Sequence, residues 1–160
     1  MAGNSEESLA IKQQFAAWLE KKKWTYKEEE DEAAYIYRFE LRGEDLPIDV
    51  IVVFEKERPQ LAVLSGLPVT IPDEKKAEAC ILLNQINDAS DFGKITMNPG
   101  SGKLRFRYCA FFGQCLVSAD FFAQVIFNSV NYIDDFNDRL LMYSKGMVPA
   151  ETAMKGLLFK

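Results

Sequence analysis

Three aspartates near the end of the chain match the D-D-x-x-D pattern, which can hold magnesium. Asp134, Asp135 and Asp138 offer hard carboxylate oxygens, and such oxygens suit a hard cation when they share one helix face. A helical wheel places all three opposite the apolar residues Phe122 and Ile133. The sequence holds no second motif of this kind, so we expect a solvated helix face and no metal site.

A second segment, Gly100-Ser101-Gly102-Lys103, matches the end of a phosphate-binding loop. That loop needs a glycine where Met97 stands and a serine or threonine where Leu104 stands. The segment is also predicted to join two strands, whereas a phosphate-binding loop joins a strand to a helix. We therefore expect a hairpin loop.

Basic and aromatic residues alternate in the strand that follows this loop. Lys103, Arg105 and Arg107 could contact a nucleic-acid backbone, with aromatic side chains stacking on its bases. Phe106 and Tyr108, however, fall on the opposite face of the strand. The chain also has a net charge of −5, which repels phosphate, so we expect a solvated face and no nucleic-acid partner.

Histidine is absent from the 160 residues. This excludes the Ser-His-Asp triad, the Cys-His dyad and every histidine-ligated metal site. The serines also lack the G-x-S-x-G context of a nucleophile elbow. The sequence therefore predicts a protein that is not an enzyme and has no catalytic, cofactor-binding or metal-binding residues.

The cysteines and apolar runs indicate the compartment. Cys80, Cys109 and Cys115 are odd in number and form no C-x-x-C pair, so we expect small buried side chains in a reducing environment. The apolar runs are far shorter than the roughly 20 residues that span a bilayer, and residues 1–7 lack the layout of a signal peptide. We expect a cytoplasmic protein without a membrane partner.

Apolar periodicity predicts one α+β domain over residues 1–160. A first helix would begin at a capping box of Asn4 and Glu7 and end at Lys21–Lys23, followed by an acidic run, 28–32, in a loop or at a strand edge. The middle strand of the next three, with Ile51, Val52 and Val53 in succession, is expected to be buried on both faces. The predicted elements are an antiparallel meander of strands 33–42, 48–54 and 60–65; a helix that begins with Pro72; a hairpin of 95–97 and 104–112; a long helix from Ser118 to Lys145; and a short helix at about 149–156.

The second helix is apolar on two sides. Ala77, Cys80 and Ile81 share one side, whereas Ala79, Leu82, Leu83 and Ile86 share the other. The sheet can cover one side only. We therefore expect a homodimer whose interface is Ala79, Leu82, Leu83 and Ile86. The alternative cover is the short terminal helix, with Val148, Met154 and Leu157.

One aromatic of the long helix lies outside its core stripe. The stripe consists of Phe122, Val125, Ile126, Ser129, Val130, Ile133, Phe136 and Leu140. Phe127 lies about 140° from Phe122 on the wheel, on the side of the aspartates, where we expect the core not to reach it. Phe127 is therefore a candidate partner surface.

Four segments carry a resemblance to a known family: Leu82-Leu83-Asn84-Gln85-Ile86-Asn87, Gly93-Lys94-Ile95, Gly102 to Tyr108, and Gly146 to Ala153. With the order of elements, they resemble the YbjN-like family, described as bacterial sensory-transduction regulators, within the type III secretion chaperone-like fold. The resemblance implies a non-catalytic regulatory module that binds an unidentified protein partner.

Two other functions remain open. The first is a dedicated cytoplasmic secretion chaperone, since such chaperones are small, acidic and dimeric and bind an extended effector segment. The second is an enzyme that uses carboxylates such as Asp134 or Asp138, which would need measurable turnover that is lost on their mutation.

Overall fold

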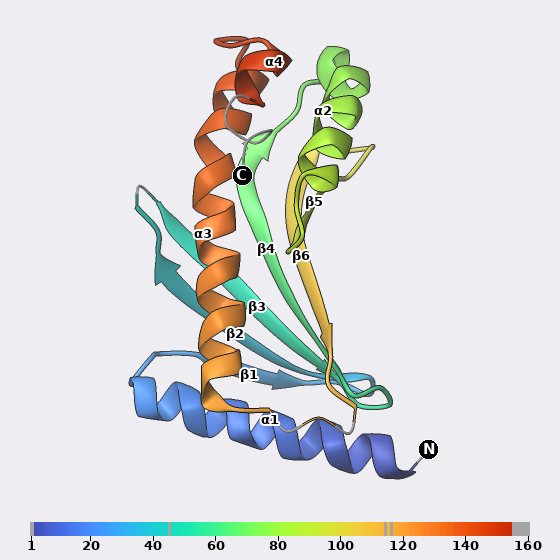
Figure 1. Ribbon diagram of the computed structural model, residues 1–160, viewed down its shortest axis with the longest axis vertical. Helices are drawn as coiled ribbons and strands as arrows, with labels where there is room; N and C mark the ends of the chain where they lie inside the picture. Colours follow the sequence, from blue (N-terminus) through green and yellow to red (C-terminus); the bar gives the residue numbers. More distant parts are fainter. Residues whose placement is uncertain (1, 45, 114, 116, 155–160) are drawn as a thin grey trace.

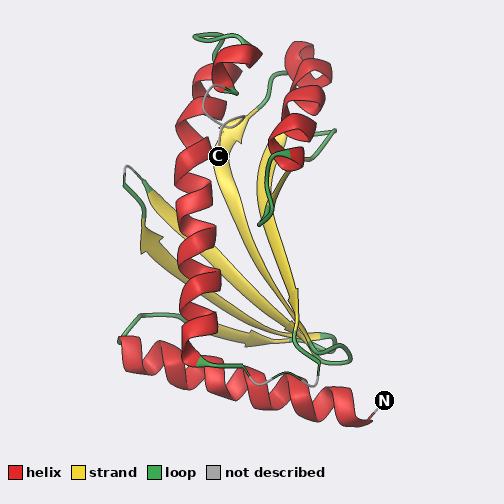
Figure 2. Cartoon of the chain, viewed as in Figure 1, coloured by secondary structure: helices red, strands yellow, loops and turns green. Residues whose placement is uncertain are grey.

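One six-stranded antiparallel sheet forms the body of the chain, and the helices pack on one of its faces (Figures 1 and 2). The computed structural model describes residues 2–44, 46–113, 115 and 117–154. In chain order the elements are α1 (Ala2–Lys22), β1 (Lys27–Glu30), β2 (Ala34–Arg42), β3 (Pro47–Glu55), β4 (Gln60–Thr70), the 3₁₀ turn η1 (Asp73–Lys75), α2 (Lys76–Asp88), β5 (Lys94–Met97), β6 (Lys103–Phe111), α3 (Ala119–Ser144) and α4 (Ala150–Ala153).

The sheet has the strand order β1-β2-β3-β4-β6-β5. The predicted meander is confirmed as β2, β3 and β4, and the hairpin as β5 and β6. The acidic run contributes β1, an edge strand whose four residues are exposed. Two ion pairs from this strand, Glu29 to Arg38 and Glu30 to Lys56, reach residues of β2 and the β3–β4 turn.

The middle strand β3 is not buried on both faces as predicted. Val52 is buried on the helix-covered face, whereas Ile51 and Val53 are half-buried on the opposite face. Helices cover only one side, so the side chains of β3 alternate between the core and the uncovered side. β3 also pairs with β4 only between Ile51 and Phe54, and the two strands then diverge (Figure 1).

The helix ends agree with the sequence in part. The hydroxyl of Ser118 caps α3 by accepting a 3.3 Å hydrogen bond from the backbone N–H of Phe121, and Gly146 follows the helix with φ +71°. By contrast, α1 begins at Ala2, so Asn4 lies inside the helix and is not its cap. Pro72 precedes η1 and is not the first residue of α2. The short terminal helix ends at Ala153; the predicted positions 155–156 lie outside the described residues.

Aromatic side chains join α1, α3 and the sheet. The ring of Phe15 on α1 lies 5.2 Å from Tyr37, 5.3 Å from Phe54 and 5.3 Å from Phe122 of α3. The pairs with Tyr37 and Phe122 are edge-to-face, and such pairs add about 0.5–1.5 kcal/mol beyond burial. All eight residues of the predicted α3 stripe are buried.

The cysteines do not have the predicted burial. Cys80, Cys109 and Cys115 are all exposed. Cys80 lies on the outer side of α2, and Cys109 lies on the sheet face that no described helix covers. Within the described residues, no helix combines the length and the hydropathy that a bilayer crossing requires.

Candidate functional site: a groove between α2 and α4

The predicted dimer interface lies inside the subunit's own core. Ala79, Leu82, Leu83 and Ile86 are 1 to 5% exposed, because this side of α2 faces β5 and α4. These four residues therefore cannot form an interface, and that assignment was wrong. A wheel shows which residues share a side, but it does not show which side is covered. The homodimer itself stays a prediction.

The outer side of α2 is the one left open. Ile81 is 64% exposed, and Cys80 beside it is also exposed. The alternative cover for the buried side is confirmed, since α4 packs against α2 and Met154 is buried. Leu157, which was part of that alternative, lies outside the described residues.

The C-terminal end of α2 is fixed to the sheet by one amide side chain. The Nδ2 of Asn87 donates to the Ile95 carbonyl at 2.9 Å, and the N–H of Ile95 donates back to the Asn87 Oδ1 at 2.9 Å. Lys94 also donates from Nζ to the carbonyl of Ser90 at 3.0 Å. These bonds set the position of α2 along β5.

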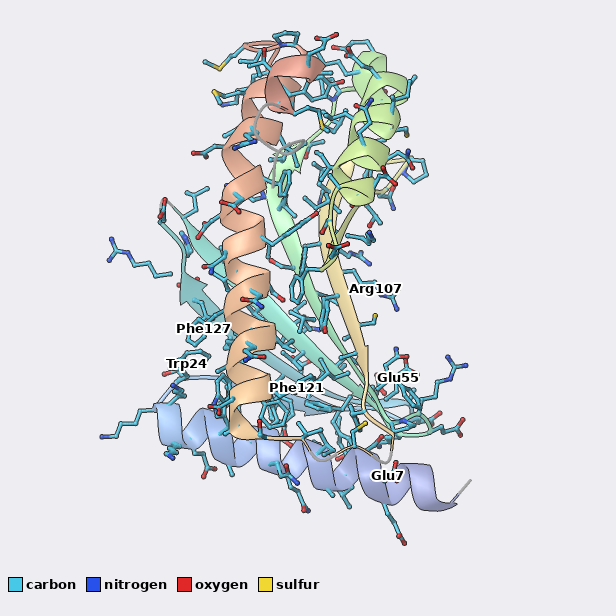
Figure 3. The ribbon with its side chains drawn as sticks, in the orientation of Figure 1. Glu7, Trp24, Glu55, Arg107, Phe121 and Phe127 are labelled. Atoms are coloured by element: carbon cyan, nitrogen blue, oxygen red, sulfur yellow. The ribbon has the colours of Figure 1, made fainter. Side chains whose placement is uncertain are left out.

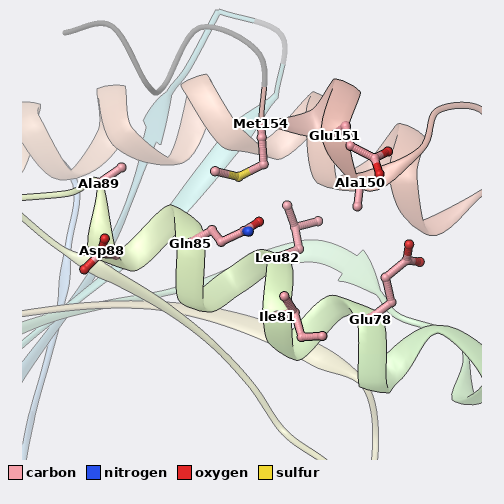
Figure 4. A pocket seen from close by; sticks show the side chains of 9 residues that line it. All are labelled: Glu78, Ile81, Leu82, Gln85, Asp88, Ala89, Ala150, Glu151 and Met154. Carbon is pink, nitrogen blue, oxygen red and sulfur yellow. The ribbon is translucent and has the colours of Figure 1, made fainter.

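A groove of about 450 Å³ lies between α2 and α4 (Figure 4). Its walls are largely apolar and are formed by Ile81, Leu82, Ala89, Ala150 and Met154. The exposed Ile81 continues this apolar surface toward solvent. Surface that is both concave and apolar is typical of sites that bind another molecule.

Three carboxylates surround these apolar walls. Glu78 and Asp88 come from α2 and Glu151 comes from α4, and the described lining contains no basic side chain (Figure 4). Gln85 adds an amide that can donate and accept. The groove therefore combines apolar contact with negative charge.

One of these carboxylates is oriented by the long helix. The hydroxyl of Tyr143 on α3 donates to Glu78 Oε2 at 2.8 Å. Burial, together with this hydrogen bond, raises the pKa of Tyr143 above its ordinary value, so the phenol keeps its proton and remains a donor. Lys75 lies 5.0 Å over the same ring and donates to the Tyr143 carbonyl at 2.7 Å.

The aspartates of the D-D-x-x-D motif do not act together. Asp135 and Asp138 are exposed, whereas Asp134 is half-buried and accepts a 3.1 Å hydrogen bond from the N–H of Glu44 in the β2–β3 loop. Asp134 thus ties α3 to that loop, which the wheel did not indicate. No cluster of three potential ligands among histidine, cysteine, aspartate and glutamate is found in the described part of the chain.

Phe127 is 42% exposed, but it has a neighbour. Its ring meets the ring of Trp24, which follows α1, at 5.8 Å and nearly at right angles (Figure 3). Phe127 therefore lies outside the core, as expected, and its ring contacts the half-buried Trp24 at the edge of the core. Its role as a partner surface stays a prediction.

Six residues of the groove were not predicted from the sequence as site residues: Glu78, Gln85, Asp88, Ala89, Ala150 and Glu151. Two predicted elements could have indicated the groove: the second helix, which has two apolar sides, and the short terminal helix, which could cover one of those sides. Had α4 been placed on the Leu82 side, the outer Ile81 and the neighbouring acids would have become the candidate surface.

Comparison with known proteins gives the family. A model of the YbjN family, described as "Putative bacterial sensory transduction regulator", matches residues 12–142. The crystal structure of E. coli YbjN, described as a putative transcription regulator, is similar with a TM-score of 0.57 and 15% identity, covering 84% of this chain and 92% of that one.

An uncharacterized protein from Methanothermobacter thermautotrophicus is similar with a TM-score of 0.51 and 17% identity, covering 84% of this chain and 94% of that one. No curated protein matches the chain. At these identities the structures show a shared fold, while the family model covers most of the sequence. The chain therefore belongs to the YbjN family.

Proposed function

We propose that this protein is a non-catalytic regulatory module that binds a segment of a partner protein in the groove between α2 and α4. The family's description as a regulator supports the regulatory part. The groove supports the binding part, because its walls are apolar and remain open at Ile81.

The charge of the groove indicates the chemistry of the partner. Glu78, Asp88 and Glu151 surround the apolar walls, so a segment with apolar side chains flanked by lysine or arginine would be complementary. Apolar contact would supply affinity and the carboxylates would supply selection by charge. The observation that carries the proposal is the exposed Ile81 among these three acids.

The groove can be tested with two labelled amphipathic peptides, one of leucine and lysine and one of leucine and glutamate. Fluorescence anisotropy should show tighter binding of the lysine peptide. The variant Ile81→Lys should weaken that binding by about tenfold or more, since it places a cation among the apolar walls. Because Ile81 is 64% exposed, the variant should fold normally.

Met147→Lys is the matched control, because Met147 is 69% exposed and does not line the groove. It should bind the lysine peptide as the wild type does. A loss of glutamate-peptide binding in Ile81→Lys as large as the loss of lysine-peptide binding, or equal effects of the two substitutions on the lysine peptide, would overturn the proposal.

A further inference from the structure

The sheet face without helices carries an apolar patch. The open-face patch consists of the half-buried residues Ile36, Ile51, Val53 and Leu64, which are contiguous through the strand register: Ile36 pairs with Val53, and Ile51 pairs with Leu64. A solvated face of an antiparallel sheet normally carries polar residues at such positions. None of the described helices packs on this side (Figures 1 and 2).

The open-face patch forms the floor of one hollow, and a second hollow lies next to it on the sheet. One hollow of about 320 Å³ is lined by Ile36, Ile51, Val53 and Leu64 at the point where β3 and β4 diverge. A second, of about 500 Å³, lies against the β5–β6 hairpin and includes Lys103. The two hollows share Gly66 and Arg105 and are therefore adjacent; we call the pair the open-face depression.

Gly66 keeps the centre of this depression open. A Cβ added at Gly66 would meet no heavy atom within 4 Å. Its backbone conformation is also one that other residues adopt, since Gly66 is absent from the positive-φ glycines. A larger side chain there would occupy the depression without disturbing the sheet.

Arginines lie on both sides of the apolar floor, and on the β2 side the exposed acids Glu40 and Asp49 lie beside Arg38 and Ile51. The register places Arg38 beside Ile51, and it places Arg107 beside Leu64 and Arg105 beside Gly66. Arg38 pairs with Glu29 at 3.3 Å, but both side chains are exposed and such pairs contribute little. Arg107 donates to the sulfur of Cys109 at 3.3 Å. Within the described residues, Arg105 has no carboxylate partner.

We infer that the open-face patch binds an extended acidic segment of a partner protein. Apolar side chains of that segment would contact Ile51, Val53 and Leu64, and its carboxylates would pair with Arg38 and Arg105. The surface lies on another side of the sheet from the groove and selects the opposite charge, so it goes beyond the function proposed above. A second copy is the weaker candidate, because a two-fold pairing of this face would bring the same arginines together.

The test uses the labelled leucine–glutamate peptide and two variants. Gly66→Leu should fill the depression, and Arg105→Glu should reverse the charge at its wall. Each should weaken binding by about tenfold or more in anisotropy titrations. Arg42→Glu is the matched control: it makes the same charge change at an exposed end of β2, outside both hollows, and should leave the affinity unchanged.

Arg105→Gln replaces Gly66→Leu in the test if that variant fails to fold, and it should also weaken binding of the leucine–glutamate peptide. The inference is overturned if neither variant affects binding, if the lysine peptide competes equally, or if the wild type forms a dimer that Gly66→Leu dissociates. The groove is tested independently, because Ile81→Lys should leave the glutamate peptide unaffected and Gly66→Leu should leave the lysine peptide unaffected.

Discussion

The hydroxyl of Tyr143, near the end of α3, donates a 2.8 Å hydrogen bond to the carboxylate of Glu78 on α2. Tyr143 is 1% exposed, whereas Glu78 lies at the surface and lines the groove. The long helix therefore places a donor under one acid of the proposed partner site, and the position of that acid depends on the core of the protein.

Removing this donor should reduce stability. Tyr143→Phe keeps the ring but loses the hydrogen bond, and we expect a cost of about 1 kcal/mol in urea unfolding at neutral pH. Tyr26→Phe, at a half-buried position, is the control and should cost less. An unchanged unfolding midpoint in Tyr143→Phe would mean that the bond contributes nothing.

The same tyrosine should make stability depend on alkaline pH. Its pKa is raised above 10.0 in the folded state, largely by burial, so above about pH 10 the unfolded chain loses this proton first. The unfolded state then binds fewer protons, and stability falls as pH rises. Tyr143→Phe should lessen that fall above about pH 10; parallel curves for the variant and the wild type would refute this assignment.

Shortening a side chain should cost much more stability on the buried side of α2 than on its exposed side. Leu82→Ala removes a side chain that is 1% exposed and should cost about 2–5 kcal/mol, whereas Ile81→Ala should cost less than about 0.5 kcal/mol. Denaturant unfolding measures both. A Leu82→Ala variant that unfolds at the wild-type midpoint would contradict the place of Leu82 in the core.

Asn84 and Asn87 both lie in the segment 82–87, which carries part of the family resemblance, but they differ in their contacts. Asn87 makes two hydrogen bonds of 2.9 Å to Ile95, whereas Asn84 is exposed. Asn87→Ala should cost about 1–3 kcal/mol, because it leaves backbone groups of β5 without partners. Asn84→Ala is the matched control and should cost less than about 0.5 kcal/mol; equal costs would contradict the role given to Asn87.

Phe127 should contribute modestly to stability through Trp24. Phe127→Ser removes an edge-to-face pair with rings 5.8 Å apart, and we expect a cost of about 0.5–1.5 kcal/mol with a change in tryptophan fluorescence. The absence of both effects would show that the pair is not formed in solution.

Much of the fold follows from local sequence patterns. The alternation in β2 and the stripe of α3 from Phe122 to Leu140 determine which sides face the core, and Ser118 and Gly146 mark the ends of α3. These features depend on periods of two and 3.6 residues and on capping chemistry, all of which are visible in one segment at a time.

Which surfaces of the protein are covered could not be predicted from local sequence patterns. Whether Ile51 is buried, or whether Leu82 faces solvent, depends on which element covers it, and that is a relation between segments distant in sequence. The same holds for Asp134, whose partner Glu44 comes from a loop 90 residues away. Single-segment periodicity carries no information about such contacts.

The most direct test of the proposed function is a map of backbone amide shifts as the leucine–lysine peptide is added to isotope-labelled protein. We predict changes confined to α2, Lys76–Asp88, and α4, Ala150–Ala153, with none in the Ile81→Lys variant. Changes centred on the open face of the sheet, or spread evenly over the molecule in both proteins, would contradict the assignment of this groove as the partner site.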